Sequence, residues 1–314
     1  MLDRRQIHRV VDMALDEDAP FGDLTSQTLV PAGAVARADL VAREPGVLAG
    51  VEVFEIAMTT LDDSVEVTLH AADGDVFEAG DVLAHVEGPA RVVLQAERVA
   101  LNLVQRMTGI ATLTRTYVEA VDGTGARVVD TRKTTPGLRA LERHAVRCGG
   151  GHNHRHSLSD AVMAKDNHLA VIPDLTDALR RARADLPHTT HIEVEVDRLE
   201  QLDAVLASGA AGTIMLDNFS LDDLRAGVAL VAGRALIEAS GNVNLDTISS
   251  IAATGVDIIS VGALTHSVRA LDLGLDVDLG TEAPRREVAE SLHGETASGD
   301  SGDATVSPIF GPRA

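Results

Sequence analysis

The chain has 314 residues, of which 45% are hydrophobic, so it can bury one large core or two ordinary ones and is neither a disordered nor a fibrous protein. Its 27 Lys and Arg residues against 48 Asp and Glu residues give a net charge of −21, and a field of this sign repels nucleic acids and anionic lipids. We therefore expect no nucleic-acid partner and no membrane partner.

Cysteine and lysine are both rare in this chain. The single cysteine, Cys148, excludes an internal disulfide framework, and no apolar run approaches the roughly 18 residues that a membrane helix needs. Because the Arg-rich start is not followed by a signal-type apolar stretch, we expect a reduced, cytoplasmic protein. Only two basic residues are lysines, Lys133 and Lys165. This acidic, lysine-poor composition predicts adaptation to high salt, where the Debye length falls to about 3 Å at 1 M and self-repulsion is screened.

The first part of the chain mixes helices with short strand-like segments. A turn at 19–22 ends an amphipathic helix whose apolar positions are Ile7, Val10, Val11, Ala14 and Leu15. Between 34 and 89, short β-like runs are separated by Pro-Gly and Asp-Gly turns, and a helix is expected over 51–61. We interpret residues 1–110 as a mixed α/β domain.

The chain from residue 90 onward predicts a connecting helix and then a parallel sheet. Residues 90–121 have helical periodicity, which we expect to be interrupted near Thr108 and Gly109. Six β-type runs that alternate with helical ones predict parallel βα units, at 127–130, 162–165, 192–195, 213–217, 236–240 and 257–261. Because a closed βα barrel has eight units, we expect an incomplete barrel or an open sheet over 111–278. The Gly-, Ser- and acid-rich segment 279–314 is expected to be a mobile acidic tail.

Polar residues follow each of the six runs, at the ends where a βα barrel carries its active site. The densest polar segments are 131–137, 149–155 and 165–168, and they contain both lysines. In so acidic a chain, cations gathered at strand ends predict an anion-binding site, although Arg132 and Lys133 could instead only neutralise neighbouring carboxylates. The two lysines favour the anion site, because an ammonium is a compact, flexible point charge that arginine cannot imitate.

These segments resemble quinolinate phosphoribosyltransferase over about residues 8–278. The resemblance rests on the order and spacing of the segments above together with 97–102, 109–112, 216–219, 238–241 and 260–265. It implies an N-terminal α/β-sandwich domain over 1–110 followed by an incomplete α/β barrel over 111–278. It also implies phosphoribosyl transfer from phosphoribosyl pyrophosphate to quinolinate with decarboxylation, which requires Mg²⁺ and takes place in a homodimer or a multiple of dimers.

The resemblance also implies roles for individual residues. The catalytic set would be Lys133, Lys165, Glu195 and Asp217. The last two would also bind ribose hydroxyls and help to organise the metal, in part through the substrate. Carboxylates and phosphates would be held by Arg132, Lys133, Arg155, Lys165 and, from the adjoining subunit, Arg98. His154 would line the quinolinate pocket, and the late loops would bind phosphate at Ser240, Gly241, Asn242, Gly262 and His266.

The implied chemistry needs cations rather than a covalent nucleophile. The planar fork of arginine pairs with both oxygens of a carboxylate. Negative charge develops on the departing pyrophosphate, where Lys and Arg donors and Mg²⁺ would stabilise it. Attack by the pyridine nitrogen makes the ring an electron sink, so that the adjacent carboxylate can leave as CO₂.

Two other interpretations concern single segments. A zinc site is suggested by a crowded group, His144, Cys148, His152, His154 and His156, but its spacing matches no zinc finger and Arg155 would sit among the ligands. Residues 74–88 resemble the hairpin of biotinyl or lipoyl carrier domains. Those domains attach their cofactor to a lysine, and no lysine precedes Lys133, so attachment is excluded.

A third alternative keeps phosphoribosyl transfer but changes the acceptor to nicotinate, without decarboxylation. Nicotinate has one carboxylate and would leave part of the cation cluster of Arg132, Arg155 and Lys165 unpaired. Because a buried unpaired charge is expensive, the dicarboxylate is favoured.

Overall fold

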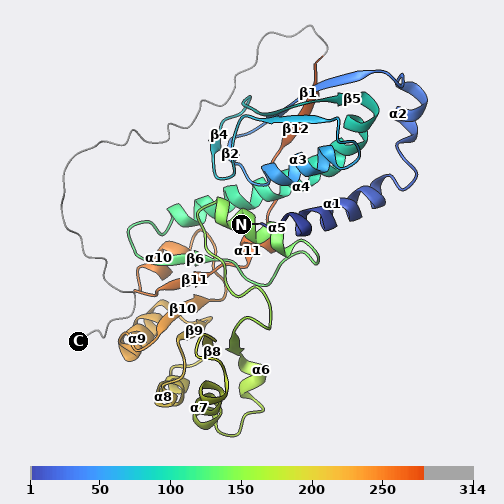
Figure 1. The fold of residues 1–314 in the computed structure, drawn as a ribbon. Coiled ribbons are helices and arrows are strands. Elements are labelled where there is room, and N and C mark those ends of the chain that lie inside the picture. Colours follow the sequence, from blue (N-terminus) through green and yellow to red (C-terminus); the bar gives the residue numbers. More distant parts are fainter. Residues whose placement is uncertain (1, 279–314) are drawn as a thin grey trace, which may run out of the picture.

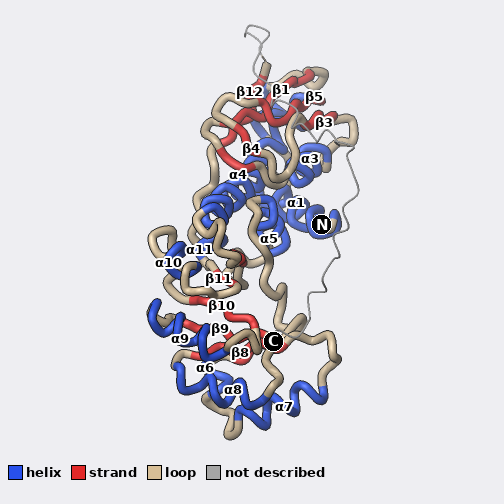
Figure 2. The backbone as a smooth tube through the Cα atoms, turned by 90° about the vertical axis from the view of Figure 1, so that its left-hand side faces the viewer, coloured by secondary structure: helices blue, strands red, loops and turns tan. Residues whose placement is uncertain are grey.

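The computed structural model describes residues 2–278, which form two sheet-centred domains joined by a long helix (Figure 1). An antiparallel sheet stands at one end and a parallel sheet at the other, with helix α4 (Ala90–Glu119) reaching from the first toward the second (Figures 1 and 2). The α/β fold expected from the sequence is confirmed. The predicted tail over 279–314 lies outside the described residues.

The N-terminal domain packs helices against a small antiparallel sheet. The strand order is β12-β1-β5-β3, and a separate ribbon pairs β2 with β4. Helices α3 and α4 contact the sheet, and α1 packs on both helices. The elements are α1 (Arg4–Asp18), α2 (Leu24–Leu29), β1 (Val35–Ala42), β2 (Gly46–Val47), α3 (Val51–Thr59), β3 (Glu66–Leu69), β4 (Val76–Phe77) and β5 (Val82–Pro89). The predicted helices near residues 7–15 and 51–61 are confirmed as α1 and α3.

Helix α4 runs unbroken through Thr108 and Gly109, so the interruption predicted there is wrong. A Cβ atom at Gly109 would lie 2.2 Å from the carbonyl oxygen of Arg269, and the N–H of Leu271 donates to the carbonyl of Gln105 at 3.0 Å. The backbone of a distant segment therefore crosses the helix at close range. Glycine at this position has no Cβ atom and so lets that segment pass close to the helix; it does not end the helix.

The second domain is a six-stranded sheet in which every neighbouring pair is parallel, in the order β6-β11-β10-β9-β8-β7. All six strands lie where the sequence predicted them. Strands β6 and β7 form the two edges and do not pair with each other within residues 2–278, so the barrel is incomplete. The strands are β6 (Arg127–Val129), β7 (Val162–Ala164), β8 (Ile192–Val196), β9 (Thr213–Asp217), β10 (Leu236–Ser240) and β11 (Ile258–Ser260).

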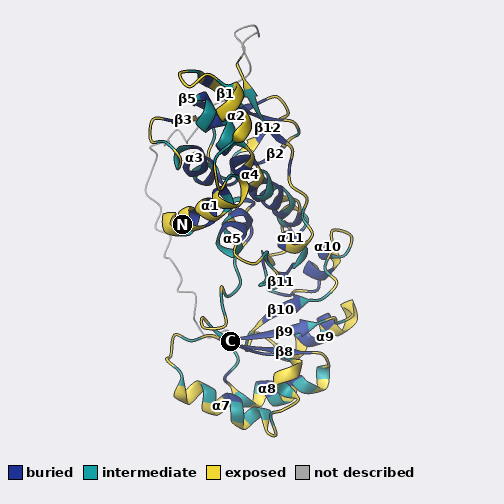
Figure 3. Cartoon of the chain, turned by 90° about the vertical axis from the view of Figure 1, so that its right-hand side faces the viewer, coloured by how far each residue is buried: buried dark blue, intermediate teal, exposed yellow. Residues whose placement is uncertain are grey.

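Helices follow the strands of this sheet. Helices α7, α8 and α9 lie along its outer side, where Figure 3 shows more exposed residues than in the strands, whereas α5 packs against α4. They are α5 (Arg139–Cys148), α6 (Asp166–Leu169), α7 (Leu175–Asp185), α8 (Leu202–Ser208), α9 (Leu221–Val231), α10 (Ile248–Ala252) and α11 (Ala263–His266). A short 3₁₀ turn at Leu199–Gln201 precedes α8. None of the helices within residues 2–278 is long and apolar enough to cross a bilayer.

The chain returns to the first domain after α11. Strand β12 (Leu273–Val277) pairs antiparallel with β1, from Ala42 opposite Leu273 to Ala38 opposite Val277. The sequence analysis placed this segment in the second domain, but the structure places it in the first sheet. The first sheet is therefore built from segments at both ends of the described chain, which ties the two domains together.

The core consists mainly of aliphatic side chains. Phe54 and Phe77 are fully buried in the first domain, and Ile192, Ile214 and Ile259 are buried in the central strands of the second. Near the carboxyl ends of β8, β9 and β10, the side chains of Glu195, Asp217 and Ser240 are only partly buried. The sheet thus presents a row of accessible polar side chains at one edge.

We predict that Gly109→Ala destabilises the protein despite the helix preference of alanine. Alanine gains about 1 kcal/mol over glycine inside a helix, but a Cβ atom pressed against the backbone at Arg269 costs about 1–3 kcal/mol or more. Urea denaturation should show a net loss of stability. The control is Gly33→Ala, where a Cβ meets nothing within 4 Å and the expected change is within about 0.5 kcal/mol. Equal stability of the two variants would contradict the close crossing.

Candidate active site

The carboxyl ends of the parallel strands surround a cavity of about 390 Å³. Its walls come from the ends of the strands and from the segments that follow them. They are formed by Thr131, Arg132, Lys133, His154, Arg155, Met163, Lys165, Glu195, Met215, Asp217, Glu238, Ser240 and Ser260. This is the volume of a small-molecule site rather than of a macromolecular groove.

Four cationic side chains line this one cavity. Arg132 and Lys133 follow β6, Arg155 lies in the segment between α5 and β7, and Lys165 follows β7. Both lysines of the chain are among them. In a chain with a net charge of −21, the cavity is therefore a local region of positive charge.

Two of these arginines have incompletely compensated charges. The Nε atom of Arg132 is buried without a hydrogen-bond partner among the described residues. Burial and the neighbouring charge of Arg132 lower the pKa of Arg155. One N–H group of Arg155 donates to the carbonyl of Ala161 at 3.0 Å. Two guanidinium groups held near each other are unfavourable unless an anion joins them. The cavity is therefore prepared for an anionic ligand.

Acidic groups balance part of this charge. The ammonium of Lys165 pairs with the carboxylate of Glu195, which projects from β8. Asp217 ends β9, and one of its oxygens accepts a hydrogen bond from the side chain of Asn218 at 2.7 Å. Glu195 is thus engaged by a lysine, while the second oxygen of Asp217 has no hydrogen-bond donor within residues 2–278.

His154 forms a compact cluster with two buried glutamates. Its Nε2 atom lies 3.1 Å from Glu193 and 3.4 Å from Glu238, and each glutamate has one further oxygen without a partner among the described residues. Burial opposes a charged imidazole, but hydrogen bonds and the charges of the two glutamates raise the pKa of His154 to about 10. Burial and the charge of Glu193 likewise raise the pKa of Glu238.

The backbone holds the ring of His154 in place. The backbone N–H of Arg155 points to Nδ1 of His154 at 2.8 Å, and Nε2 is directed at the carboxylates of Glu193 and Glu238. The pKa values of His154 and Glu238 are both raised, so His154 and Glu238 together retain an extra proton at neutral pH.

Comparison with known proteins agrees with this geometry. The family model described as quinolinate phosphoribosyl transferase, N-terminal domain, matches residues 23–108, and that of the C-terminal domain matches residues 110–276. The chain belongs to the quinolinate phosphoribosyl transferase family. It is 49% identical to the carboxylating nicotinate-nucleotide pyrophosphorylase of Mycobacterium leprae, over 84% of this chain and 94% of that protein.

Solved structures of family members have the same fold. The chain is similar to NadC from Streptococcus pyogenes, with 42% identity and a TM-score of 0.82, over 88% of this chain and 97% of that one. It is also similar to the nicotinate-nucleotide pyrophosphorylase from Francisella tularensis, with 36% identity and a TM-score of 0.83, over 88% and 98% of the two chains. The α/β-sandwich and incomplete barrel of this family are therefore present here.

Five residues that the sequence analysis assigned to the site do not line the cavity. Arg98 lies exposed on α4, where its guanidinium is 4.0 Å from the carboxylate of Glu97. Gly241 and Asn242 adopt positive φ angles of 90° and 52° just after β10, where Asn242 donates to Asn218 at 3.0 Å. Gly262 and His266 stand beside Lys133, since a Cβ at Gly262 would lie 3.1 Å from both side chains. These four late-loop residues therefore surround the mouth of the cavity.

Two site residues were missed from the sequence, Glu193 and Glu238. A signal for them existed, because each stands two residues before a predicted site residue, Glu195 or Ser240, and side chains at i and i+2 of a strand point to the same face. An acidic residue inside a hydrophobic strand was the second signal. Neither motif spacing nor charge counting could show that both carboxylates meet His154.

A buried ion pair holds the segment that carries His154 and Arg155. Arg143 on α5 contacts Asp130 at 3.1 Å and donates to the backbone carbonyls of His154 at 2.6 Å and Arg155 at 3.2 Å. Asp130 in turn accepts from the backbone N–H of His154 at 2.8 Å and from Asn153. Because both charges are buried, this network fixes the backbone of these two cavity-lining residues in one arrangement.

A second network holds the segment that carries Lys133. Arg106 on α4 pairs with buried Glu142 at 2.6 Å and donates to Thr135 and to the carbonyl of Thr265. The hydroxyl of Thr265 donates to the carbonyl of Lys133 at 2.8 Å. Helix α4, which joins the domains, therefore helps to position the backbone of Lys133.

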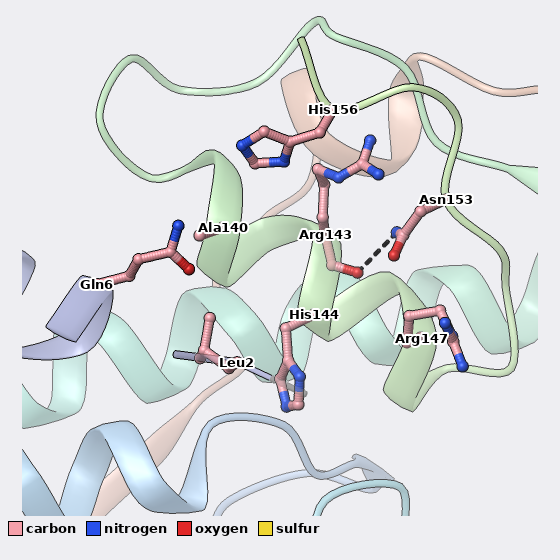
Figure 4. Close-up of a pocket in the computed structure, with 8 residues that line it drawn as sticks. All are labelled: Leu2, Gln6, Ala140, Arg143, His144, Arg147, Asn153 and His156. Atoms are coloured by element: carbon pink, nitrogen blue, oxygen red, sulfur yellow. Dashed lines mark hydrogen bonds between the residues drawn. The ribbon is translucent and has the colours of Figure 1, made fainter. Parts of the chain in front are cut away.

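The zinc group suggested by the sequence does not form as such. His154 groups with Glu193 and Glu238, of which His154 and Glu238 line the cavity, whereas His144 and Cys148 lie against Asp73 of the first domain. His152 and His156 belong to neither group. A second cavity of about 340 Å³ opens between α1 and α5 and is lined by His144 and His156 together with Arg143 and Arg147 (Figure 4).

We predict that Arg143→Ala strongly destabilises the protein. The substitution leaves the carboxylate of Asp130 buried without its cation, which costs about 3–5 kcal/mol. Chemical denaturation measures the loss. Arg115→Ala, which breaks an exposed pair with Glu119 on α4, is the matched control and should change stability little. A small effect of Arg143→Ala would show that the pair does not organise this segment.

The stabilising effect of His154 is expected to fade in alkaline solution. The folded-state pKa of about 10 lies above the unfolded value of about 6.5, so the contribution is complete below about pH 6.5 and lost as the pH rises through the folded value. The difference in unfolding free energy between the unchanged protein and His154→Asn should therefore shrink from about pH 6 to about pH 10. A difference independent of pH over this range would refute the shared proton.

Proposed function

We propose that this protein transfers phosphoribosyl from phosphoribosyl pyrophosphate to quinolinate, with decarboxylation, to give nicotinate mononucleotide, pyrophosphate and CO₂. The observation that carries the proposal is the convergence of Arg132, Lys133, Arg155 and Lys165 on one cavity of a strongly acidic chain. Both reactants are polyanions, so each can supply the negative charge that these side chains lack. The activity named for the relatives, carboxylating nicotinate-nucleotide pyrophosphorylase, is the same reaction.

The acceptor would be held by the arginines. A pyridine ring with two adjacent carboxylates offers two planar groups, and Arg132 and Arg155 offer two planar forks. The unpartnered Nε of Arg132 gives one donor for this purpose. The extra proton on His154 and Glu238 reduces the repulsion that a substrate carboxylate would meet at this part of the cavity.

The second substrate would lie against the lysines and the late loops. Lys133 would stabilise charge on the departing pyrophosphate, and Lys165, fixed by Glu195, would stand between the two reactants. Backbone N–H groups near Gly241 and Gly262 would receive the ribose phosphate, because glycine lets the chain approach closely. Glu195 and Asp217 are the carboxylates available for ribose hydroxyls. Catalysis then rests on positioning and electrostatics.

Magnesium fits the acidic side of the cavity. Mg²⁺ keeps several waters and is held by one or two carboxylates together with substrate phosphates. Asp217 has an oxygen free for this role, whereas Glu195 is engaged by Lys165, so we propose that Asp217 holds the ion and that Glu195 contributes less directly. When bound, the ion would neutralise charge on the pyrophosphate.

We further propose that the active assembly is a homodimer or a multiple of dimers. Arg98 does not line the cavity of its own chain, and its side chain is largely exposed, so it is free to enter the cavity of a second copy. There it would add one more cation for a carboxylate or phosphate.

The acceptor is tested by a direct comparison. The protein is mixed with phosphoribosyl pyrophosphate, Mg²⁺ and either quinolinate or nicotinate in high salt, and the mononucleotide and CO₂ are quantified. We expect product from quinolinate with one CO₂ for each mononucleotide. Product from nicotinate alone would replace this proposal with transfer that occurs without decarboxylation.

The roles of the cations are tested by Lys133→Ala and Arg155→Ala. Each removes a donor to an anionic group, so kcat/KM should fall at least tenfold, in line with the roughly 3 kcal/mol typical of such a donor. The melting temperature should stay nearly unchanged, because both side chains are partly or fully accessible. Arg115→Ala serves as the control for a cation far from the cavity, and wild-type rates in both site variants would refute the assignment.

A further inference from the structure

We propose that Asp73, His144 and Cys148 form a site for Zn²⁺ that links the two domains. Asp73 lies between β3 and β4 of the first domain, whereas His144 and Cys148 belong to α5, which follows the first strand of the second domain. One ligand atom from each residue lies within 4.8 Å of the other two. The three donors are a carboxylate oxygen, an imidazole nitrogen and a sulfur, which is the ligand chemistry of zinc.

The spacing of the three residues suits a chelating site. His144 and Cys148 stand four residues apart on α5, so their side chains share one face of the helix. Asp73 approaches the same face, with its Oδ2 atom 2.6 Å from Nε2 of His144. Ligand atoms around a tetrahedral zinc ion lie roughly 3.3–3.7 Å apart, so a small outward shift of the side chains admits the ion.

The orientation of Asp73 is fixed independently of any ion. Its Oδ1 atom accepts from the backbone N–H groups of Gly50 at 2.7 Å and Val51 at 3.0 Å, at the start of α3. The carboxylate is thus held by one oxygen, while the other faces His144. Outer hydrogen bonds of this kind orient the ligands of a metal.

The charges at this site are suited to a divalent cation. The thiol of Cys148 would release its proton when the cation binds. One thiolate and one carboxylate would neutralise Zn²⁺. Arg143, the nearest buried cation on α5, is already paired with Asp130, and Arg147 is exposed to solvent. The cluster of His154, Glu193 and Glu238 is a poorer candidate, because four cations line its cavity.

The site lies beside an open cavity. His144 lines the cavity of about 340 Å³ between α1 and α5, whereas Asp73 and Cys148 do not. Figure 4 shows the ring of His144 at one end of this cavity, pointing away from the guanidinium of Arg143. All three proposed ligands are only partly buried, so water can supply the fourth ligand. A zinc ion here would fasten α5, and with it the segment of His154 and Arg155, to the first domain.

The experiment uses Co²⁺ as a spectroscopic probe in the full-length protein after dialysis against a chelator. Cys148 is the only cysteine, so sulfur-to-cobalt charge-transfer absorption in the near ultraviolet can come from this site alone. We expect one Co²⁺ per chain with this absorption, displacement of Co²⁺ by Zn²⁺, and a higher melting temperature with Zn²⁺ than with chelator.

Variants separate this site from adventitious binding at other histidines. Cys148→Ala should abolish the charge-transfer band, and His144→Ala should weaken Co²⁺ binding at least tenfold. His152→Ala, which removes an exposed histidine four residues after Cys148, should bind as the unchanged protein does. Absence of the band in the unchanged protein, or a band that survives His144→Ala at full affinity, would overturn the proposal. These readouts do not depend on catalytic activity.

Discussion

Mutual repulsion among cations is the constraint on which the site depends. Four basic side chains share one cavity, and the pKa of Arg155 is lowered by burial and by the neighbouring Arg132. Such an arrangement is unfavourable unless anions complete it. Glu195 is already paired with Lys165, and His154 and Glu238 retain a proton that limits the negative charge beside them. Anionic reactants would supply the negative charge that these cations still lack.

Two networks of ion pairs and hydrogen bonds hold the segments that carry the cations in place. Arg143 and Asp130 fix the backbone of His154 and Arg155, and Arg106 with Glu142 fixes the segment before α5. Both networks are anchored in α4 or α5, the two helices that pack against each other between the sheets. The proposed zinc site would add a third fastening at the far end of α5. Rigid support of this kind is what positional catalysis requires.

Much of this arrangement was predictable from the sequence, for identifiable reasons. Parallel strands have a strong local signature, and each carried its polar residue at the end, so Lys165, Glu195 and Asp217 were placed correctly in relation to their strands. Long-range contacts were not predictable. Gly109 suggested a break in α4 because nothing local shows that residues 269–271 cross it, and the pairing of β12 with β1 joins positions more than 200 residues apart. Glu193 and Glu238 were missed because their importance lies in a shared contact with His154.

On the proposed function, the cavity recognises two adjacent carboxylates on one aromatic ring. Isothermal titration calorimetry of the full-length protein with phthalate and with benzoate tests this directly, since the two compounds differ by one carboxylate and neither can react. The account predicts that phthalate binds at least tenfold more tightly, and that most of this preference disappears in Arg132→Ala. Equal affinity for the two compounds in the unchanged protein would contradict it.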